Sequence, residues 1–398
     1  MKRFLTIATA VLLGLLLSVA CEKESPTHNE PTPEPKPQPG PLTESHTLLI
    51  YMQGNNGLAE FMDSNLQRVL TAFYNVPHDK ARIVVFYDRG NYTRLTELYL
   101  DDGMAKQRLI KEYETSTSTV DKEFMREVFA TVKREAAADS YGLILSSHGG
   151  GWVPSDLYDA YLLGEESRAA EHPSANPLFY GQDDSDCMEV PELVDAISDI
   201  YFNYIIFDAC FMSNVEALYD MRNAADYIVA SPAEILGTGF PYEEMIPMLF
   251  SREDHMLEEV CKEYMELYAS SSGTIALIDC KRLDALAEAM RQVVATADLS
   301  KADAESIQPY DNFDYHLYFD LLHYVEMIAT EEAYNNFTDI LEQVVLYSGY
   351  TEQLITTTGD DTPIEVTRSC GLSCYVAQEE CPTTYSAWQE TAWAQAIE

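Results

Sequence analysis

The chain alternates between short apolar runs and longer amphipathic stretches. Apolar runs bounded by polar turn residues predict strands that are buried on both faces. Strands that alternate with helices indicate a largely parallel sheet covered by helices on both faces, which is an α/β fold. The predicted strands are His46–Met52, Ala81–Tyr87, Tyr141–Ser146, Tyr204–Phe207, Tyr227–Ser231 and Thr274–Asp279.

Amphipathic stretches between these strands predict the covering helices. Residues Arg94–Leu100 alternate in polarity and predict an edge strand or hairpin, whereas Trp152–Met188 is acidic and irregular. Residues Arg282–Tyr347 look mainly helical, and Ile364–Val376 returns to strand character. The predicted helices of the first part are Leu58–Phe73, Lys122–Ala137, Val190–Ser198, Asn214–Arg222 and Asp254–Ser270.

The N-terminus carries a predicted export signal. Two basic residues precede an apolar run too short for a membrane span, and the following Leu17–Cys21 resembles a bacterial lipobox. We expect residues 1–20 to be removed and Cys21 to be lipidated; the alternative is an ordinary secretory signal with a chance cysteine. We therefore expect a protein of the cell envelope of a Gram-negative bacterium, on the outer membrane rather than the inner membrane, with surface exposure as a further expectation.

Three further segments complete the expected organisation. Residues 21–45 are rich in proline and nearly free of apolar residues, which predicts an extended tether. Residues 46–280 hold the alternating strands and helices, and residues 281–398 form a mainly helical C-terminal region with late strands. With 398 residues, of which 46% are hydrophobic, the chain can bury a large core.

The charge balance excludes one class of partner. The chain has 25 Lys and Arg against 66 Asp and Glu, a formal net charge of -41. Nucleic acid is therefore not an expected partner, because phosphate binding requires a basic face. The acidic surface either serves solubility or attracts basic substrates.

The eight cysteines do not form a zinc pattern, because the sequence has no Cys-x-x-Cys pair. An exported protein can form disulfides, so a bridge among Cys370, Cys374 and Cys381 is one expectation.

Two of the predicted strands end in reactive residues. Ile144–Ser146 leads to His148-Gly-Gly-Gly-Trp, and Ile205–Phe207 leads to Asp208-Ala-Cys210. Sites in open parallel sheets form beyond the carboxyl ends of the strands. If these strands are neighbours, His148 and Cys210 meet above one edge of the sheet.

Such a pair supplies what thiol chemistry needs. The thiolate is the nucleophile, and an imidazole takes its proton and later protonates the leaving amine. The amides of Gly149 and Cys210 are the candidate oxyanion hole. Each residue also has an ordinary interpretation: a cysteine after an apolar strand is often a small core residue, and a lone histidine is often a hydrogen-bonded surface or core residue.

The two motifs together resemble the active-site signature of clostripain-like cysteine peptidases, family C11, which are relatives of caspases, legumains and gingipains. The opening strand with Asn55-Asn56, the segment after Cys210 and the late Gly371-Leu-Ser-Cys-Tyr block also resemble the family. The resemblance implies a caspase-like sandwich and an endopeptidase that cleaves after Arg or Lys. It also places Asp208 in the basic-selective S1 pocket; the alternative is a carboxylate that caps a turn.

Two further expectations come from the resemblance. Several relatives cut themselves between the histidine and the cysteine, and Arg168 is the one Lys or Arg in that interval, so we expect autocleavage there to give a nicked two-chain form of a monomer. The dyad needs no cofactor, but some relatives need calcium. Asp183, Asp184 and Asp186 form an acidic cluster without EF-hand spacing, and a solvated acidic loop is the favoured interpretation.

Three other functions compete with this interpretation. A serine esterase would require a Gly-x-Ser-x-Gly elbow, and a metallopeptidase would require His-Glu-x-x-His; neither motif is in the sequence. The remaining alternative is a non-catalytic surface lipoprotein that binds peptide or glycan, for which the 26 tyrosines would suit a binding surface.

Overall fold

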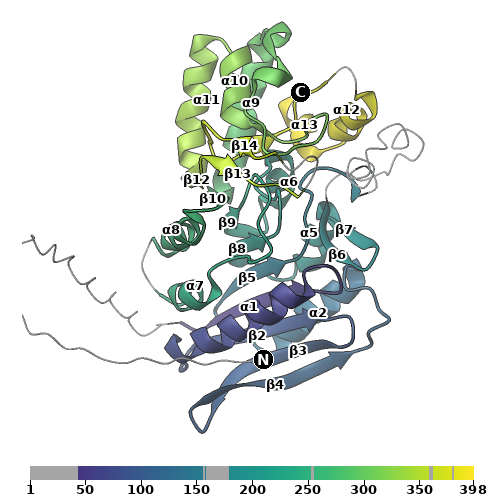
Figure 1. The fold of residues 1–398 in the computed structure, drawn as a ribbon, viewed down its shortest axis with the longest axis vertical. Helices are drawn as coiled ribbons and strands as arrows, with labels where there is room; N and C mark the ends of the chain where they lie inside the picture. Colours follow the sequence, from purple (N-terminus) through teal and green to yellow (C-terminus); the bar gives the residue numbers. More distant parts are fainter. Residues whose placement is uncertain (1–43, 156, 158–178, 252–254, 358–361, 379–380) are drawn as a thin grey trace, which may run out of the picture. The chain divides into compact units, whose positions relative to one another are not determined.

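A nine-stranded sheet forms the centre of the computed structural model (Figure 1). The structure describes residues 44–155, 157, 179–251, 255–357, 362–378 and 381–398. The strands follow the order β12-β10-β9-β8-β5-β1-β2-β3-β4. Their bounds are β1 (His46–Gln53), β2 (Ala81–Asp88), β3 (Thr93–Asp101), β4 (Met104–Tyr113), β5 (Ser140–Ser146), β8 (Phe202–Asp208), β9 (Ala225–Ala230), β10 (Thr274–Asp279) and β12 (Val345–Tyr350).

The sheet is parallel at its centre and antiparallel at both edges. Strands β2, β1, β5, β8 and β9 pair in parallel, whereas β3 and β4 on one side and β10 and β12 on the other are antiparallel. The five central strands are buried on both faces, as their apolar runs predicted. The expected caspase-like α/β sandwich is therefore confirmed.

Helices cover the sheet in two layers because successive strand residues point to opposite faces. Leu48, Ile50 and Met52 of β1 face one layer, and Leu49 and Tyr51 face the other. The first layer contains α1 (Ala59–Ala72), α7 (Tyr242–Met248) and α8 (Met256–Tyr268). The second contains α2 (Lys122–Glu135), α5 (Val190–Ile197), α6 (Val215–Met221) and α9 (Leu283–Thr296).

The C-terminal region adds helices and one strand to this sandwich. Strand β12 pairs antiparallel with β10, so the sheet continues past residue 280. Figure 1 shows α9, α10 (Leu321–Ile328) and α11 (Glu331–Val344) gathered near β12, and α12 (Pro382–Gln389) and α13 (Ala392–Ile397) follow at the end of the chain. The side chains of Asp320 and Thr330 cap the N-termini of α10 and α11.

Several elements differ from the sequence expectations. Strand β4 was not predicted, because it is an exposed edge strand rich in charge rather than an apolar run. Helix α7 was also missed, since it is short and contains Pro247. The segment Ile364–Val376 forms only the two-residue strands β14 (Ile364–Glu365) and β15 (Ser373–Cys374), each paired with an equally short partner.

The acidic insertion is not wholly irregular. Its described end forms the hairpin of β6 (Phe179–Asp183) and β7 (Asp186–Glu189). The Asn-rich turn after β1 holds this hairpin: Asn55 Nδ2 donates to the Asp183 carboxylate at 2.7 Å, and Asn56 Nδ2 donates to the Gln182 carbonyl at 2.8 Å. The hairpin thereby lies beside the carboxyl ends of the central strands.

None of the seven cysteines among the described residues is joined to another in a disulfide. The disulfide expected among Cys370, Cys374 and Cys381 is therefore not formed in this structure. Of the three, Cys374 and Cys381 are buried, where a reduced cysteine behaves as a small apolar residue.

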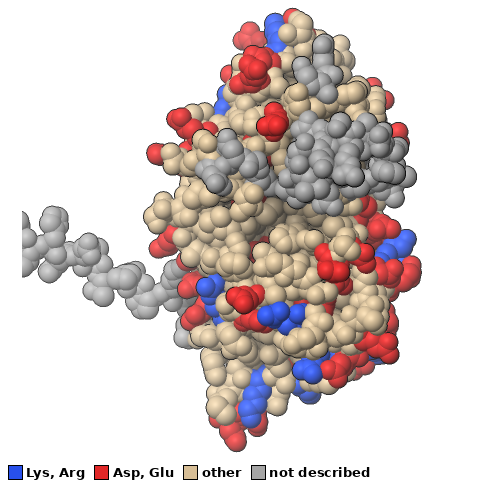
Figure 2. All heavy atoms as spheres, turned by 45° about the vertical axis from the view of Figure 1, so that its right-hand side comes forward, with Lys and Arg blue, Asp and Glu red and all other residues tan. Residues whose placement is uncertain are grey.

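On the face shown in Figure 2, acidic side chains are spread out rather than gathered in one patch. None of the helices in the described ranges is both long and apolar enough to span a bilayer.

Candidate active site

The paired ends of β5 and β8 bring the two predicted motifs together. The strands run parallel, with Ser146 opposite Asp208 as their last paired residues. His148 and Cys210 each follow two positions later, so they leave adjacent strands at the same level. The Ser147 amide also donates to the Asp208 carbonyl oxygen at 3.3 Å. The adjacency expected from the sequence is present.

The glycines after His148 allow the two loops to pack backbone against backbone. A Cβ at Gly149 would lie 2.7 Å from the Cys210 carbonyl oxygen, and a Cβ at Gly151 would lie 2.6 Å from that of Phe211. Gly151 also has a φ of +55°. Phe211 itself has a φ of 60°, an uncommon left-handed conformation for a bulky residue. The turn after Cys210 is therefore strained and held by its surroundings.

The Cys210 thiol is only partly exposed and lies against the backbone of Ile235. The Ile235 amide donates to Sγ at 3.3 Å, and Sγ lies 3.7 Å from the carbonyl oxygen of the same residue. Burial raises the pKa of Cys210 to about 12, and the negative charges of Glu234 and Asp208 act in the same direction. The resting sulfur is therefore a thiol rather than a thiolate.

Burial lowers the pKa of His148 below its ordinary value of 6.5, and no charged group among the described residues offsets the effect. A neutral imidazole and a neutral thiol are the resting state that these two shifts define. In that state the imidazole can accept the thiol proton while sulfur attacks a carbonyl carbon.

Within the described part of the chain, the Gly149 amide, a candidate oxyanion donor, has no hydrogen-bond acceptor. Gly149 forms an isolated antiparallel bridge with Tyr180. The hydrogen bonds of that bridge run from Gly150 to Phe179 at 3.2 Å and from Gly181 to His148 at 2.9 Å, which leaves the Gly149 amide out. An amide without a protein acceptor next to the thiol can donate to a developing oxyanion.

Asp208 is a buried carboxylate that is incompletely neutralised. Its Oδ2 accepts hydrogen bonds from the Tyr242 hydroxyl at 2.7 Å and from Ser146 Oγ at 3.1 Å. Burial raises the pKa of Asp208 to about 6, and only these two hydroxyls oppose the shift. Gly239, with a φ of +68°, lies so close that a Cβ there would be 2.7 Å from Oδ2. No described Lys or Arg pairs with this carboxylate.

The structure adds residues that sequence reasoning did not select. Ile235 and Glu234 belong to the loop after β9, and Tyr242 opens α7. Two buried tyrosine hydroxyls in this part of the described structure, those of Tyr180 and Tyr264, have no hydrogen-bond partner, and Asp208 raises the pKa of both after burial. Tertiary packing brings these residues to the site from segments that lie apart in the sequence.

One member of the acidic cluster considered for calcium, Asp183, instead accepts hydrogen bonds within the fold. Asp183 accepts from the Thr119 amide at 2.6 Å and from Asn55, and it is buried. Within the described residues, no group of three or more His, Cys, Asp or Glu is arranged to hold a metal ion. Calcium dependence stays a prediction without a site in this part of the chain.

Two predicted positions lie outside the described residues. These are Arg168, the expected autocleavage site, and Cys21, the expected lipidation site. Both stay predictions.

A caspase-like sandwich with a cysteine and a histidine at adjacent strand ends defines a cysteine peptidase. The chain belongs to the clostripain family, whose model matches residues 50–396. Among curated proteins, clostripain from Hathewaya histolytica is 23% identical over 232 residues, which are 50% of this chain and 41% of that protein. The chain thus matches about two fifths of the length of that relative.

Solved structures agree over most of the chain. An inactive zymogen of a C11 protease from Parabacteroides distasonis is 30% identical with a TM-score of 0.78, covering 89% of this chain and 99% of that one. A secreted C11 cysteine protease from Bacteroides thetaiotaomicron, solved with an irreversible peptide inhibitor, is 27% identical with a TM-score of 0.77 and the same coverage. These matches confirm a cysteine peptidase of the C11 type.

Proposed function

We propose that this chain is an endopeptidase that cleaves protein substrates after Arg or Lys, with Cys210 as nucleophile and His148 as general base. The observation that carries the proposal is the buried Asp208 carboxylate two residues before the thiol, with no cationic partner among the described residues. An unpaired buried carboxylate is costly unless a ligand supplies the opposite charge. A P1 guanidinium or ammonium group would supply that charge.

The reaction that we infer uses these groups in turn. His148 accepts the Cys210 proton as sulfur attacks the scissile carbonyl carbon, and the Gly149 amide, with that of Cys210, donates to the carbonyl oxygen as it gains charge. The imidazolium then protonates the amine of the departing peptide, which leaves a thioester on Cys210. Water attacks the thioester with His148 again as base, and the thiol is restored.

Maturation and location are further parts of the proposal. Arg168 lies between the two catalytic residues in a polar stretch, which suits a self-processing cut by an enzyme that prefers Arg. Cys21 follows a lipobox-like pattern, so the mature chain would be anchored to the cell envelope through lipid and the proline-rich segment of residues 21–45. The enzyme would act as a monomer, either intact or nicked.

The test is cleavage of reporter peptides ending in Arg, Lys or Asp by residues 22–398, with the Cys210→Ala variant as control. We expect cleavage after Arg or Lys, its loss in the variant, and wild-type fragments that begin at residue 169, read by mass spectrometry. Cleavage after Asp would keep the dyad and discard the role of Asp208. No cleavage of any peptide, with or without calcium and reductant, would favour the non-catalytic peptide- or glycan-binding lipoprotein. An active wild-type enzyme that stays intact would refute the cut at Arg168.

A further inference from the structure

One residue of the C-terminal region contacts both active-site loops. Tyr318 is fully buried, and its hydroxyl donates to the Gly150 carbonyl oxygen at 2.6 Å. Its ring stacks on that of Phe211, with centroids 4.1 Å apart and planes 11° from parallel. Gly150 belongs to the loop that carries His148, and Phe211 directly follows Cys210. Tyr318 therefore joins the two loops across their interface.

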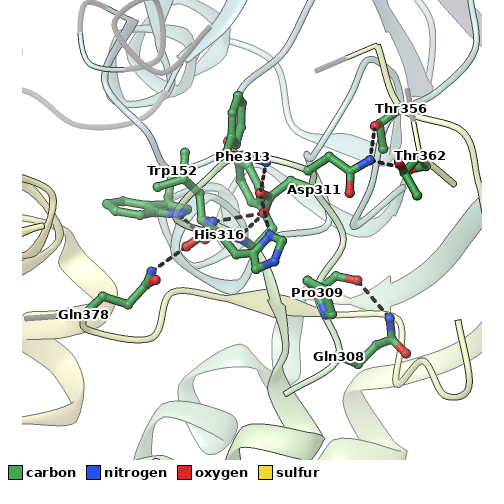
Figure 3. A network of polar contacts seen from close by, with 12 residues as sticks. Trp152, Gln308, Pro309, Asp311, Phe313, His316, Thr356, Thr362 and Gln378 are labelled. Carbon is green, nitrogen blue, oxygen red and sulfur yellow. Dashed lines mark hydrogen bonds and ion pairs between the residues drawn. The ribbon is translucent and has the colours of Figure 1, made fainter. Parts of the chain in front are cut away.

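The segment that presents Tyr318 is fixed by a buried carboxylate. Asp311 is fully buried and accepts hydrogen bonds from the amides of Leu317 and Tyr318, both at 2.9 Å, and from that of Phe313 at 3.0 Å. His316 Nδ1 lies 3.1 Å from the same carboxylate (Figure 3). A carboxylate with this many donors fixes the backbone around it, since moving any donor leaves a buried group unpaired.

A second tether runs from this segment to the histidine loop. Trp152 Nε1, at the end of the glycine run, donates to the Leu317 carbonyl oxygen at 3.1 Å (Figure 3). A Cβ at Gly151 would lie 3.2 Å from the Tyr318 ring, so that ring also limits how the glycine run can move. The segment thus packs along the histidine loop beyond the single hydroxyl contact.

The contact with Phe211 matters because that residue is strained. A left-handed φ at a phenylalanine persists only when its surroundings hold it. Phe211 receives one such restraint from its amide, which donates to the Ala233 carbonyl oxygen at 3.0 Å, and a second from the stacked Tyr318 ring. The direction in which the chain leaves Cys210 depends on this conformation.

We propose that Tyr318 is a positioning residue that fixes the separation between His148 and Cys210. The inference rests on the proposed function, because it assigns the separation a catalytic meaning. Proton transfer between thiol and imidazole requires hydrogen-bond reach, and small displacements of reacting groups lower rates by about 10- to 100-fold. Removing the hydroxyl should therefore lower kcat and leave substrate affinity nearly unchanged.

The test compares Tyr318→Phe and Tyr318→Leu with Tyr310→Phe in the purified protein. Tyr310 is a matched control: it is buried in the same segment, and its hydroxyl bonds Asp320 and Ser369 rather than either active-site loop. The measurements are kcat and KM on an Arg reporter peptide, the rate of Cys210 alkylation by iodoacetamide between pH 6 and 9, and the thermal midpoint.

We expect Tyr318→Phe to lower kcat about tenfold with KM within about twofold, and Tyr318→Leu to lower kcat further. Both should slow Cys210 alkylation near neutral pH, where the imidazole assists the thiol. Tyr310→Phe should lower the thermal midpoint by a similar amount and leave kcat and alkylation unchanged. Equal kinetic effects from Tyr318→Phe and Tyr310→Phe, or no kinetic effect of Tyr318→Phe, would overturn the inference.

The alkylation arm separates this inference from the proposed function. If wild-type protein cleaves no peptide, the proposed function fails, and the alkylation rates still show whether Tyr318 sets the environment of Cys210. Unchanged alkylation in both Tyr318 variants would then refute the positioning role itself.

Discussion

The central strands have a group of polar side chains at each end, and the two groups differ in how many of their hydrogen bonds are formed. At their amino ends, His46 of β1 is bonded on both ring nitrogens, with Nδ1 2.8 Å from Ser140 Oγ and Nε2 3.0 Å from the Tyr204 hydroxyl. At their carboxyl ends, the His148 ring has no hydrogen-bond partner among the described residues, and the Asp208 carboxylate has two hydroxyl donors and no cation. Both histidines have pKa values lowered by burial.

Burial alone does not distinguish the two groups, because it lowers the pKa of both histidines. They differ in whether all of their hydrogen-bonding atoms have partners. At the amino end both ring nitrogens of His46 already have partners, so a ligand would gain no hydrogen bond from them. The carboxyl-end group leaves an imidazole, an amide and a carboxylate with unused capacity, which a substrate can satisfy. Sites of parallel sheets lie at this end because the loops there diverge from adjacent strands.

The largest expected effect comes from removing the negative charge of Asp208 at the carboxyl ends of the central strands. We expect Asp208→Asn to lower kcat/KM for Arg and Lys reporters by about 100-fold or more, because a buried charge pair with the P1 side chain is lost. Stability at pH 7 should rise by about 1–3 kcal/mol, since the folded-state pKa of about 6 makes the ionised form unfavourable. Peptide kinetics and urea unfolding measure the two effects.

Asp183→Asn is the matched control for that variant. Asp183 is a buried carboxylate near the same end of the sheet, but it is bonded to the Thr119 amide and to Asn55. We expect Asp183→Asn to lower stability and to leave the preference for basic residues unchanged. A stability loss in Asp208→Asn with unchanged preference would contradict the distinction between the two carboxylates.

A smaller effect, about tenfold per pH unit, is expected in the pH profile. The pKa of Asp208 is raised to about 6, so the group is neutral below that value and cannot pair with a cation. The kcat/KM for Arg peptides should therefore fall as pH drops through about 6, whereas kcat should fall less because bound substrate favours the carboxylate. The measurement is kcat/KM from pH 4.5 to 8.

In Asp208→Asn the fall of kcat/KM near pH 6, the acid limb of the pH profile, should disappear. The remaining limb should lie at lower pH, where His148 becomes protonated. An unchanged limb near pH 6 in the variant would show that another group controls the profile.

The smallest expected effect concerns His46, at the amino ends of the central strands. Burial lowers the pKa of His46 to about 4, so the unfolded chain binds an additional proton between about pH 6.5 and 4. The contribution of His46 to stability is complete above pH 6.5 and falls by about 2–3 kcal/mol by pH 4.5. His46→Gln should remove this part of the pH dependence of urea unfolding. If it does so and also changes kcat/KM, the two ends of the strands are coupled rather than independent.

The sequence determined much of the framework of this protein. Continuous apolar runs specified the buried parallel strands, because both faces of such strands must avoid water. The reactive residues at the ends of two runs specified where chemistry could occur. The exposed hairpin strand β4 (Met104–Tyr113) and the short helix α7 (Tyr242–Met248) carried no such pattern, since each is stabilised mainly by its neighbours.

Tertiary structure alone decided what completes the site. Tyr242, Ile235 and Tyr318 reach the active-site loops from separate segments, and their local sequence does not show which groups they contact. Hydrophobic periodicity reports which face of an element is buried, but it does not report which distant side chain lies opposite. The sequence therefore pointed to the proposed reacting groups, whereas packing fixed their protonation and their relative placement through burial and hydrogen bonds.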